Sequence, residues 1–211
     1  MYEITKRLLD ITFSIILLIV FSPVIVASAI AIKFTSTGPV LADSPRRVGK
    51  GGKLFYPYKF RSMIVNAHQL LKTDPRFKKL YQEYKKSSYK LHSDPRWIPV
   101  GGLMRKHSID EIPQLVNVLK GEMSVVGPRP YYPDELENQQ RRYPDTQELV
   151  KEVLSVKPGI TGFWQVSGRS EVNFDKRIEM DAYYARKKSI LLDFLILLKT
   201  PWAMISGKGA V

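Results

Sequence analysis

The sequence of 211 residues predicts a mostly helical α+β fold. Three observations carry this prediction: residues 11–32 form an uncharged apolar run, several later segments place apolar residues at helical spacing, and residues 35–65 are rich in turns and β-prone aromatics. We expect an N-terminal re-entrant membrane helix, a small β element and amphipathic helices at the interface. The chain is therefore divided into residues 1–34, a membrane-inserted helix–break–helix, and residues 35–211, a cytosolic domain on the membrane surface.

The composition excludes several classes of chemistry. The chain has no cysteine, which rules out a thiol nucleophile, thiolate zinc and disulfides. Its net charge of +13 indicates a polyanionic partner. Residues 1–34 hold three basic and two acidic side chains, a net of +1, so +12 belongs to residues 35–211.

The apolar run of residues 11–32 is long enough for a membrane segment. As a helix at about 1.5 Å per residue it reaches roughly 33 Å, against about 30 Å for the hydrocarbon core. Pro23 should break the helix at its centre, and Ser22 can bond a freed carbonyl. Lys6, Arg7 and Lys33 place positive charge at both ends. This pattern favours a re-entrant segment with both ends in the cytoplasm over a straight span, a buried core helix or a signal peptide.

Residues 35–65 are expected to be turn-rich and partly β. The basic, glycine-rich stretch 46–53 is either a solvated hairpin turn or a loop that meets phosphate or lipid headgroups. It lacks the spacing of a phosphate-binding P-loop. Residues 54–63 favour an extended or edge strand, because Pro57 cannot donate a ladder hydrogen bond.

Residues 66–96 are polar and mostly helical in pattern. The apolar side chains of Phe77, Leu80, Tyr81 and Tyr84 recur at helical spacing, which predicts a stripe that packs or lies on a surface.

Residues 108–120 predict the clearest helix, ended by Gly121. Ser108 and Glu111 have capping-box spacing, or Asp110 alone is the cap. We prefer Asp110, because it places Pro113 in the first helical turn. The positive helix end should then keep the Asp110 carboxylate ionised near neutral pH.

Further helices are expected over residues 134–142, 146–154 and 170–187. Residues 189–198 are apolar and end at Lys199, Pro201 and Trp202. This segment is too short to span a bilayer. It fits an interfacial helix or an ordinary core helix equally well.

Adjacent Asp110 and Glu111 are the strongest candidates for chemistry. An ionised carboxylate can attack phosphorus or bind Mg²⁺, although a simple acidic cap also explains the pair. Arg105 precedes the pair and Arg129 follows it in a rigid Gly-Pro-Arg-Pro turn suited to phosphate contacts. Other basic residues can add to such a site: Lys59, Arg61 and Arg169. The three histidines have no metal-binding spacing.

Several motifs together make the chain resemble the bacterial sugar transferase family, the small monotopic phosphoglycosyl transferases. The matching stretches are YKFRSM (58–63), SIDEIPQLVNVLKGEMSVVGPRP (108–130), KPGITGFWQVSGR (157–169), FDKRIEMDAYYARKKSILLDFLILLKT (174–200) and the apolar run broken at Ser22-Pro23. The resemblance covers essentially the whole chain.

The resemblance implies transfer of a hexose-1-phosphate from a UDP-sugar to polyprenyl (undecaprenyl) phosphate at the cytoplasmic face of the bacterial inner membrane. This is the first membrane step of exopolysaccharide, O-antigen or glycoconjugate synthesis. Asp110 resembles the nucleophile that expels UMP and forms a covalent phosphosugar, and Glu111 resembles its partner near Mg²⁺. The family's basic residues around the phosphates are matched here by Lys59, Arg61, Arg105, Arg129 and Arg169. Asp181 matches an acidic position of the family near the site.

The chain departs from the family pattern at residues 41–46, where a one-residue insertion leaves their roles open. Residues 66–96 resemble the versions found in larger hexose-1-phosphate transferases of the family, and this resemblance favours glucose or galactose over an acetamido sugar. The alternative function is a non-catalytic, membrane-anchored basic binding protein. Nucleic acid is not expected as a partner, because no known nucleic-acid-binding signature occurs. A homodimer stays open, although no heptad pattern predicts one.

Overall fold

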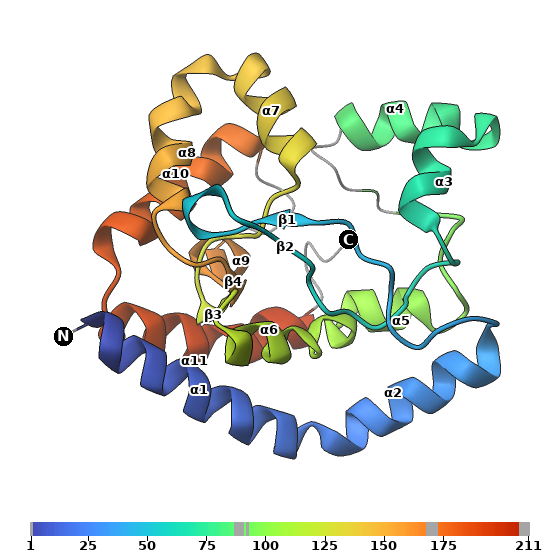
Figure 1. Cartoon of the computed structure of the whole chain (residues 1–211), viewed down its shortest axis with the longest axis horizontal. Coiled ribbons are helices and arrows are strands. Elements are labelled where there is room, and N and C mark those ends of the chain that lie inside the picture. Colours follow the sequence, from blue (N-terminus) through green and yellow to red (C-terminus); the bar gives the residue numbers. More distant parts are fainter. Residues whose placement is uncertain (1, 87–90, 92, 168–172, 207–211) are drawn as a thin grey trace.

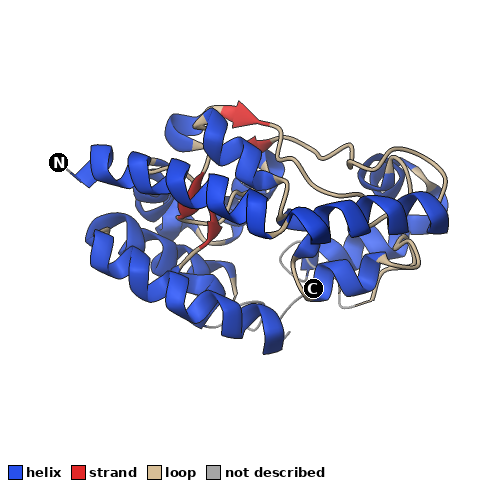
Figure 2. Ribbon diagram, turned by 90° about the horizontal axis from the view of Figure 1, so that it is seen from below, coloured by secondary structure: helices blue, strands red, loops and turns tan. Residues whose placement is uncertain are grey.

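The computed structural model describes residues 2–86, 91, 93–167 and 173–206. This part of the chain is mostly helical, with short strands among the helices (Figures 1 and 2). The α-helices are α1 (Tyr2–Val20), α2 (Ser22–Thr35), α3 (Ala67–Thr73), α4 (Lys78–Lys86), α5 (Gly101–Lys106), α6 (Gln114–Lys120), α7 (Pro133–Arg142), α8 (Gln147–Leu154), α9 (Phe163–Ser167), α10 (Phe174–Lys187) and α11 (Ile190–Ser206). The 3₁₀ turns are η1 (Lys50–Gly52), η2 (Pro75–Phe77), η3 (Ile109–Glu111) and η4 (Pro144–Thr146). The strands are β1 (Arg47–Val48), β2 (Leu54–Phe55), β3 (Ser124–Val126) and β4 (Gly159–Thr161).

The N-terminal helix is broken where the sequence predicts. Helices α1 and α2 meet at Phe21 with a bend of 60°, and they run along one edge of the molecule (Figure 1). Pro23 has no N–H to offer to the carbonyl of Ile19, and Ser22 Oγ donates to that oxygen at 2.8 Å instead. In the described part of the chain no single helix is long and apolar enough to cross a membrane, whereas the bent pair together is.

The predicted β element is a small hairpin. Strands β1 and β2 pair antiparallel, with Arg47 opposite Phe55. Gly51 and Gly52 have positive φ angles in the exposed turn, which fits a solvated hairpin turn. The prediction of a strand over residues 54–63 is right only at its start. Beyond β2 the chain is loop with isolated bridges, including one between Leu41 and Phe60.

A second two-stranded sheet packs against α1, α6 and α11. Strands β3 and β4 pair parallel, with Ser124 opposite Gly159 and Val126 opposite Thr161. Their apolar side chains join those of the neighbouring helices in one core cluster: Phe55, Val118, Met123, Val125, Val126, Tyr184 and Ile196. This sheet is therefore the centre of the part of the molecule that carries the Gly-Pro-Arg-Pro turn.

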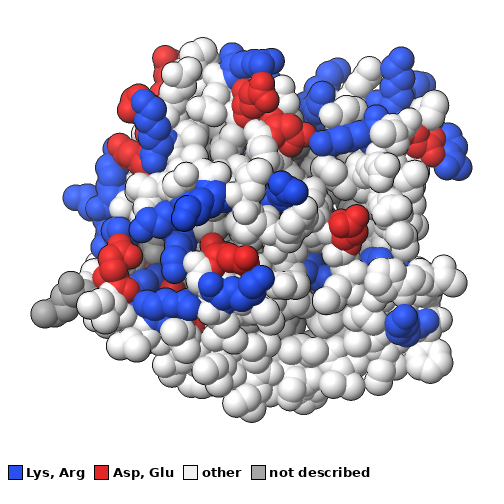
Figure 3. Space-filling view, viewed as in Figure 1, with Lys and Arg blue, Asp and Glu red and all other residues white. Residues whose placement is uncertain are grey.

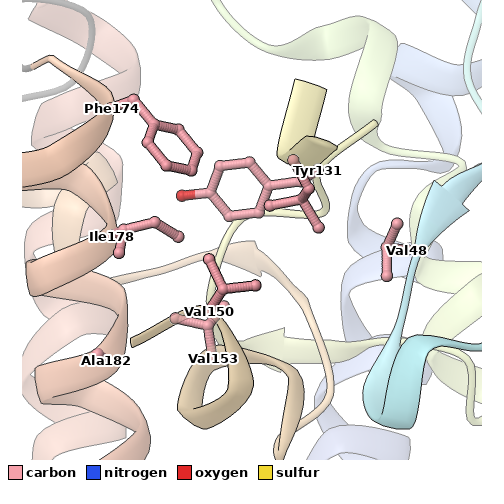
Figure 4. Close-up of a cluster of buried hydrophobic side chains, with 8 residues drawn as sticks. Val48, Tyr131, Val150, Val153, Phe174, Ile178 and Ala182 are labelled. Atoms are coloured by element: carbon pink, nitrogen blue, oxygen red, sulfur yellow. The ribbon is translucent and has the colours of Figure 1, made fainter. Parts of the chain in front are cut away.

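A further cluster joins α2 and α5 through Ile32, Phe60, Ile98 and Met104. Two more clusters hold other helices. One joins α7, α8 and α10 to β1, with Tyr131 and Phe174 packed edge to face at its centre (Figure 4). The other contains the stripe predicted over residues 77–84, which packs against Leu71, Leu91 and Tyr132. The packing interpretation of that stripe is confirmed.

Two helix predictions are wrong in detail. Residues 108–120 do not form one helix capped by Asp110: Ser108 has a φ of 56°, and the chain makes the 3₁₀ turn η3 before α6 starts at Gln114. The helix predicted over residues 189–198 does not end at Pro201 but continues to Ser206. Pro201 therefore lies inside α11, where it lacks the N–H for one helical hydrogen bond but does not end the helix.

The outward faces of α1, α2 and α11 are apolar. Large side chains exposed there are Ile4, Leu8, Ile15, Ile16, Ile19, Val20, Val24, Val26, Ile30, Phe34, Leu191, Phe194, Leu195, Leu198 and Trp202. In Figure 3 the edge formed by α1 and α2 is almost free of charged side chains, which gather over the other elements. Helix α11 thus exposes one apolar face, whereas Asp193 and Ile196 on its opposite face are buried.

Candidate active site

Six of the predicted site residues line one cavity of about 500 Å³. Its walls come from the 57–68 segment, from η3, from the Gly-Pro-Arg-Pro turn and from the last turns of α11. At one end the cavity reaches Leu17 and Phe21 at the break between α1 and α2. The residues predicted to handle phosphate that line it are Lys59, Arg61, Arg105, Asp110, Glu111 and Arg129.

The acidic pair is placed by an unusual turn. Ser108 takes the left-handed conformation, which is costly for a residue with a side chain and is typical of functional sites. The following turn η3 carries Asp110 and Glu111, and Phe60 N–H donates to Asp110 O at 2.9 Å. Asp110 is only 4% exposed, yet it is one of the residues that line the cavity. The backbone thus holds the carboxylate at the cavity wall.

Lys59 faces the acidic pair from the neighbouring segment. Its Nζ donates to Glu111 Oε1 at 2.5 Å. The segment that carries it is fixed by buried Asn117 of α6, whose side chain donates to Tyr56 O and accepts from Tyr58 N–H, both at 2.8 Å. Helix α6 therefore fixes the segment that carries Lys59, and it also begins just after the turn η3 that carries the acidic pair.

The two carboxyl groups of the pair titrate differently. Burial raises the pKa of Asp110 above its usual value, with Lys59 opposing the rise and Glu111 adding to it. Burial also acts to raise the pKa of Glu111, but Lys59, Arg129 and Arg47 outweigh it and leave that pKa below its usual value. The predicted influence of a helix end on Asp110 is therefore replaced by burial, which shifts the pKa in the opposite direction.

Arg129 is held by a close approach of two glycine-containing turns. A Cβ on Gly127 would lie 2.5 Å from Lys157 O, and one on Gly159 would lie 2.1 Å from Gly127 N. The two turns also exchange backbone bonds, Gly127 N–H to Thr161 O at 2.9 Å and Gly159 N–H to Pro128 O at 2.8 Å. Only glycine allows this contact, so the glycines fix the loop that points Arg129 at the cavity.

Asp181 lies behind this loop and does not line the cavity. Its Oδ2 accepts from Tyr131 OH at 2.8 Å and from Arg129 N–H at 3.2 Å. Burial raises its pKa to about 7, although both hydrogen bonds act in the other direction. Asp181 thus supports the loop of Arg129 from a position near the cavity, and its predicted contact with a substrate stays a prediction.

The other predicted cations take distinct positions. Arg61 lines the cavity, but its guanidinium donates to Pro39 O at 2.6 Å and to Ser36 Oγ at 2.9 Å, which ties the chain after α2 to the core. The Arg105 guanidinium carbon lies 6.0 Å from the centre of the Trp97 ring, and its charge opposes the rise that burial causes in the pKa of Asp110. Arg169 lies outside the described residues.

Sequence reasoning missed a second group on the cavity wall. The Arg47 guanidinium lies 3.2 Å from the centre of the Tyr132 ring and donates to Pro130 O at 3.0 Å. His68 stacks on the same Tyr132 ring, with 5.4 Å between the ring centres, and burial lowers the pKa of His68 to about 4. Only the basic pair at residues 46–47 hinted at this group, because its members are far apart in the sequence.

The acidic pair also tests the predicted metal. Among the described residues no three His, Asp or Glu side chains form a metal-binding group. Magnesium, however, takes one or two carboxylates and completes its shell with water and substrate phosphates. The adjacent carboxylates of Asp110 and Glu111 fit that donor set.

The geometry defines a class of site: a cavity lined by several basic side chains and by the acidic pair Asp110 and Glu111, next to helices whose outward faces are apolar. The chain belongs to the bacterial sugar transferase family, whose profile matches residues 1–207.

Named relatives share most of this chain. It is 43% identical over 209 residues, 97% of its length, to the undecaprenyl-phosphate galactose phosphotransferase of Salmonella typhimurium. It is 38% identical over 211 residues to the exopolysaccharide production protein ExoY of Sinorhizobium fredii, and the match covers 98% of this chain and 88% of that protein. It is 37% identical over 212 residues, 99% of its length, to the UDP-N-acetylgalactosamine-undecaprenyl-phosphate N-acetylgalactosaminephosphotransferase of Aeromonas hydrophila. The chain spans only 41% of the first relative and 45% of the third.

Proposed function

We propose that this chain moves a hexose-1-phosphate from a UDP-sugar to undecaprenyl phosphate and releases UMP, as the first membrane step of exopolysaccharide or related glycan synthesis. The observation that carries the proposal is the buried Asp110 carboxylate at the wall of a cavity that also presents Lys59, Arg105 and Arg129. The names of the relatives support the substrate classes. The names of those relatives give different sugars. The choice of glucose or galactose as the transferred sugar is therefore also a proposal.

In the first half-reaction, an Asp110 carboxylate oxygen attacks the β-phosphorus of the donor. The bond between that phosphorus and the oxygen bridging to the α-phosphate breaks, and UMP leaves with the electron pair. The product is an acyl phosphate between Asp110 and the sugar phosphate. Lys59 and Arg129 bring positive charge to the wall where negative charge builds up on the phosphates.

In the second half-reaction, a phosphate oxygen of the lipid acceptor attacks the same phosphorus. The bond to Asp110 breaks, and the carboxylate is restored. Neither step requires a proton at the reacting atoms, so the ionised Glu111 serves to hold Lys59 at the site. Magnesium bound by Asp110, Glu111 and the donor phosphates would neutralise phosphate charge.

The proposed setting is the cytoplasmic leaflet of the bacterial inner membrane. The bend at Phe21, the Ser22 bond to Ile19 O and the exposed apolar faces of α1, α2 and α11 support a re-entrant insertion with α11 at the interface. The cavity reaches the break between α1 and α2, so the lipid phosphate and the water-soluble donor can meet there. The +12 charge outside residues 1–34 suits both anionic substrates and the anionic leaflet.

The test is UMP release by the purified protein with a panel of UDP-sugars, Mg²⁺ and undecaprenyl phosphate. We expect release with at least one UDP-hexose, and a loss of about a thousandfold or more in Asp110→Asn. The matched control is Asp145→Asn, which changes an exposed acid far from the cavity and should keep full activity. Vesicle binding without UMP release from any sugar would instead support a non-catalytic, membrane-anchored binding protein.

A further inference from the structure

A buried network of charges on α1 has no part in the chemistry above. Asp10 is 3% exposed, and its carboxylate accepts hydrogen bonds from three groups. Ser124 Oγ donates to it at 2.8 and 3.0 Å, Val125 N–H at 3.0 Å and Lys6 Nζ at 3.2 Å. The Asp10 side chain thus bonds helix α1 to both a side chain and a backbone N–H of β3.

The same network includes α11. Lys6 Nζ lies 3.1 Å from Asp193 Oδ2, so it bridges the acids of two helices. Asp193 is 5% exposed and accepts from Tyr184 OH at 2.6 Å and Tyr2 OH at 3.2 Å. The polar faces of α1 and α11 meet here, while their opposite faces are exposed and apolar.

A neighbouring residue adds a second tie. The Arg7 guanidinium donates to Val118 O at 2.6 Å and to Leu119 O at 2.8 Å. These carbonyls belong to the last turn of α6, where a cation is favoured by the helix dipole. Helix α6 starts three residues after Glu111, and β3 leads into the turn of Arg129. Helix α1 therefore contacts the two elements next to the site, α6 and β3.

Insertion into a membrane does not require these charges. A buried ion pair contributes little to stability relative to apolar residues, and its best-attested use is to fix one arrangement of packed elements. Here the fixed arrangement joins the two outward apolar helices to β3, which continues directly into Gly127, Pro128 and Arg129. The network therefore sets the cavity relative to the apolar face.

We propose that Asp10 is a positioning residue that sets the orientation of the cavity relative to the lipid surface. This inference rests on the proposed function. Since the donor comes from water and the acceptor stays in the bilayer, losing the network should spare the first half-reaction and slow the second. Loss of general stability would lower both.

The first experiment compares the two half-reactions in Asp10→Ala and in the milder Ser124→Ala. Formation of the Asp110 adduct is followed in detergent without acceptor, and full turnover in vesicles that contain undecaprenyl phosphate. We expect Asp10→Ala to form the adduct at nearly the wild-type rate and to turn over about ten- to a hundredfold more slowly. Ser124→Ala should show the same split, but smaller.

The matched control is Glu3→Gln. This substitution also removes a contact between an acid of α1 and a lysine, since Glu3 accepts from Lys188 Nζ at 2.7 Å, but the pair is exposed and does not touch β3. Its two half-reactions should match the wild type. Equal losses in both half-reactions of Asp10→Ala, or unchanged turnover in vesicles, would overturn the proposal.

A second measurement is independent of the chemistry. Because the chain has no cysteine, nitroxide labels can be placed at Leu8→Cys on α1 and Glu148→Cys on α8, both exposed. The distance between the labels in vesicles should be narrowly distributed in the parent and in Glu3→Gln, and broader or shifted in Asp10→Ala. An unchanged distribution in Asp10→Ala overturns the inference. If the wild type forms no adduct, the proposed reaction fails, and this distance still decides the role of Asp10.

Discussion

At the residue scale, burial decides the electrostatics of the acidic residues. Asp110 and Asp181 are both buried and both have a raised pKa, whereas Glu111 has a lowered pKa because Lys59 and other cations surround it. The network of charges therefore favours an ionised Glu111 next to a more weakly acidic Asp110. Lys59 is the cation that ties the pair together.

Asp181 gives a pH prediction. The unfolded chain loses this proton near its usual pKa of 3.8, while the folded chain keeps it until about pH 7. The folded state thus binds more protons across this window, and ionising Asp181 costs on the order of 4 kcal/mol of stability as pH rises through it. Asp181→Asn keeps an oxygen that can accept the Tyr131 and Arg129 bonds, and removes this cost.

The measurement is the free energy of unfolding by denaturant between pH 4 and pH 8. The difference between Asp181→Asn and the wild type should move in favour of the variant as pH rises, because other titrating groups cancel in that difference. A difference that stays constant across the window would contradict the raised pKa.

The sequence predicted some site residues and missed others for physical reasons. Asp110 and Glu111 were predicted because they are adjacent, and Arg129 because a rigid Gly-Pro-Arg-Pro turn carries it. Lys59 was added as a nearby basic residue, and the resemblance supported it. The contact of Arg47 with Tyr132 was missed, because tertiary packing joins residues far apart in the chain. Asp110 as a helix cap was wrong, because Ser108 adopts a left-handed backbone that sequence patterns do not reveal.

At the element scale, the contact between β3 and β4 sets the loop of Arg129. In Gly159→Ala the added Cβ would lie 2.1 Å from Gly127 N and 2.4 Å from Thr161 O, so the backbones must separate. We expect the variant to lose about 3 kcal/mol of stability or more. Chemical denaturation measures this loss, and Gly102→Ala, whose Cβ meets only the Trp97 side chain, is the control with an expected change under about 1 kcal/mol. Equal stability of the two variants would contradict the close approach.

The break between α1 and α2 carries the topology. Pro23→Ala restores the missing N–H, so the two helices should straighten and the segment should tend to span the membrane. A single cysteine at Glu3 then reports the side of the N-terminus through a membrane-impermeant maleimide. In intact cells we expect labelling only after Pro23→Ala.

Pro201→Ala is the matched control, since Pro201 lies inside α11 without ending it. It should leave the N-terminus protected. Labelling of the otherwise unchanged chain from outside would rule out the re-entrant arrangement.

The elements themselves were largely predictable. Helical spacing located α7, α8 and α10, and Pro23 located the break, because these signals are local. The short strands and the continuation of α11 past Pro201 were not predictable in detail, since neighbouring elements rather than local sequence decide them.

At the scale of the whole molecule, the apolar faces of α1, α2 and α11 predict the membrane contact. Leu198 is 61% exposed on α11, so Leu198→Glu should leave the fold intact and weaken vesicle binding about tenfold or more. Co-sedimentation with anionic vesicles measures this. Leu54→Glu, at an exposed position of the hairpin, is the control and should bind as the wild type does. Equal binding of both variants would place the membrane contact elsewhere.

The central claim is that Asp110 carries the sugar phosphate. Its most direct test is the intact mass of the protein after incubation with a UDP-hexose and Mg²⁺ in the absence of undecaprenyl phosphate, followed by peptide mapping. The account predicts a gain of one hexose phosphate on the peptide that contains Asp110, its loss on addition of undecaprenyl phosphate, and no gain in Asp110→Asn. Release of UMP with no adduct, or an adduct that persists in Asp110→Asn, would contradict it.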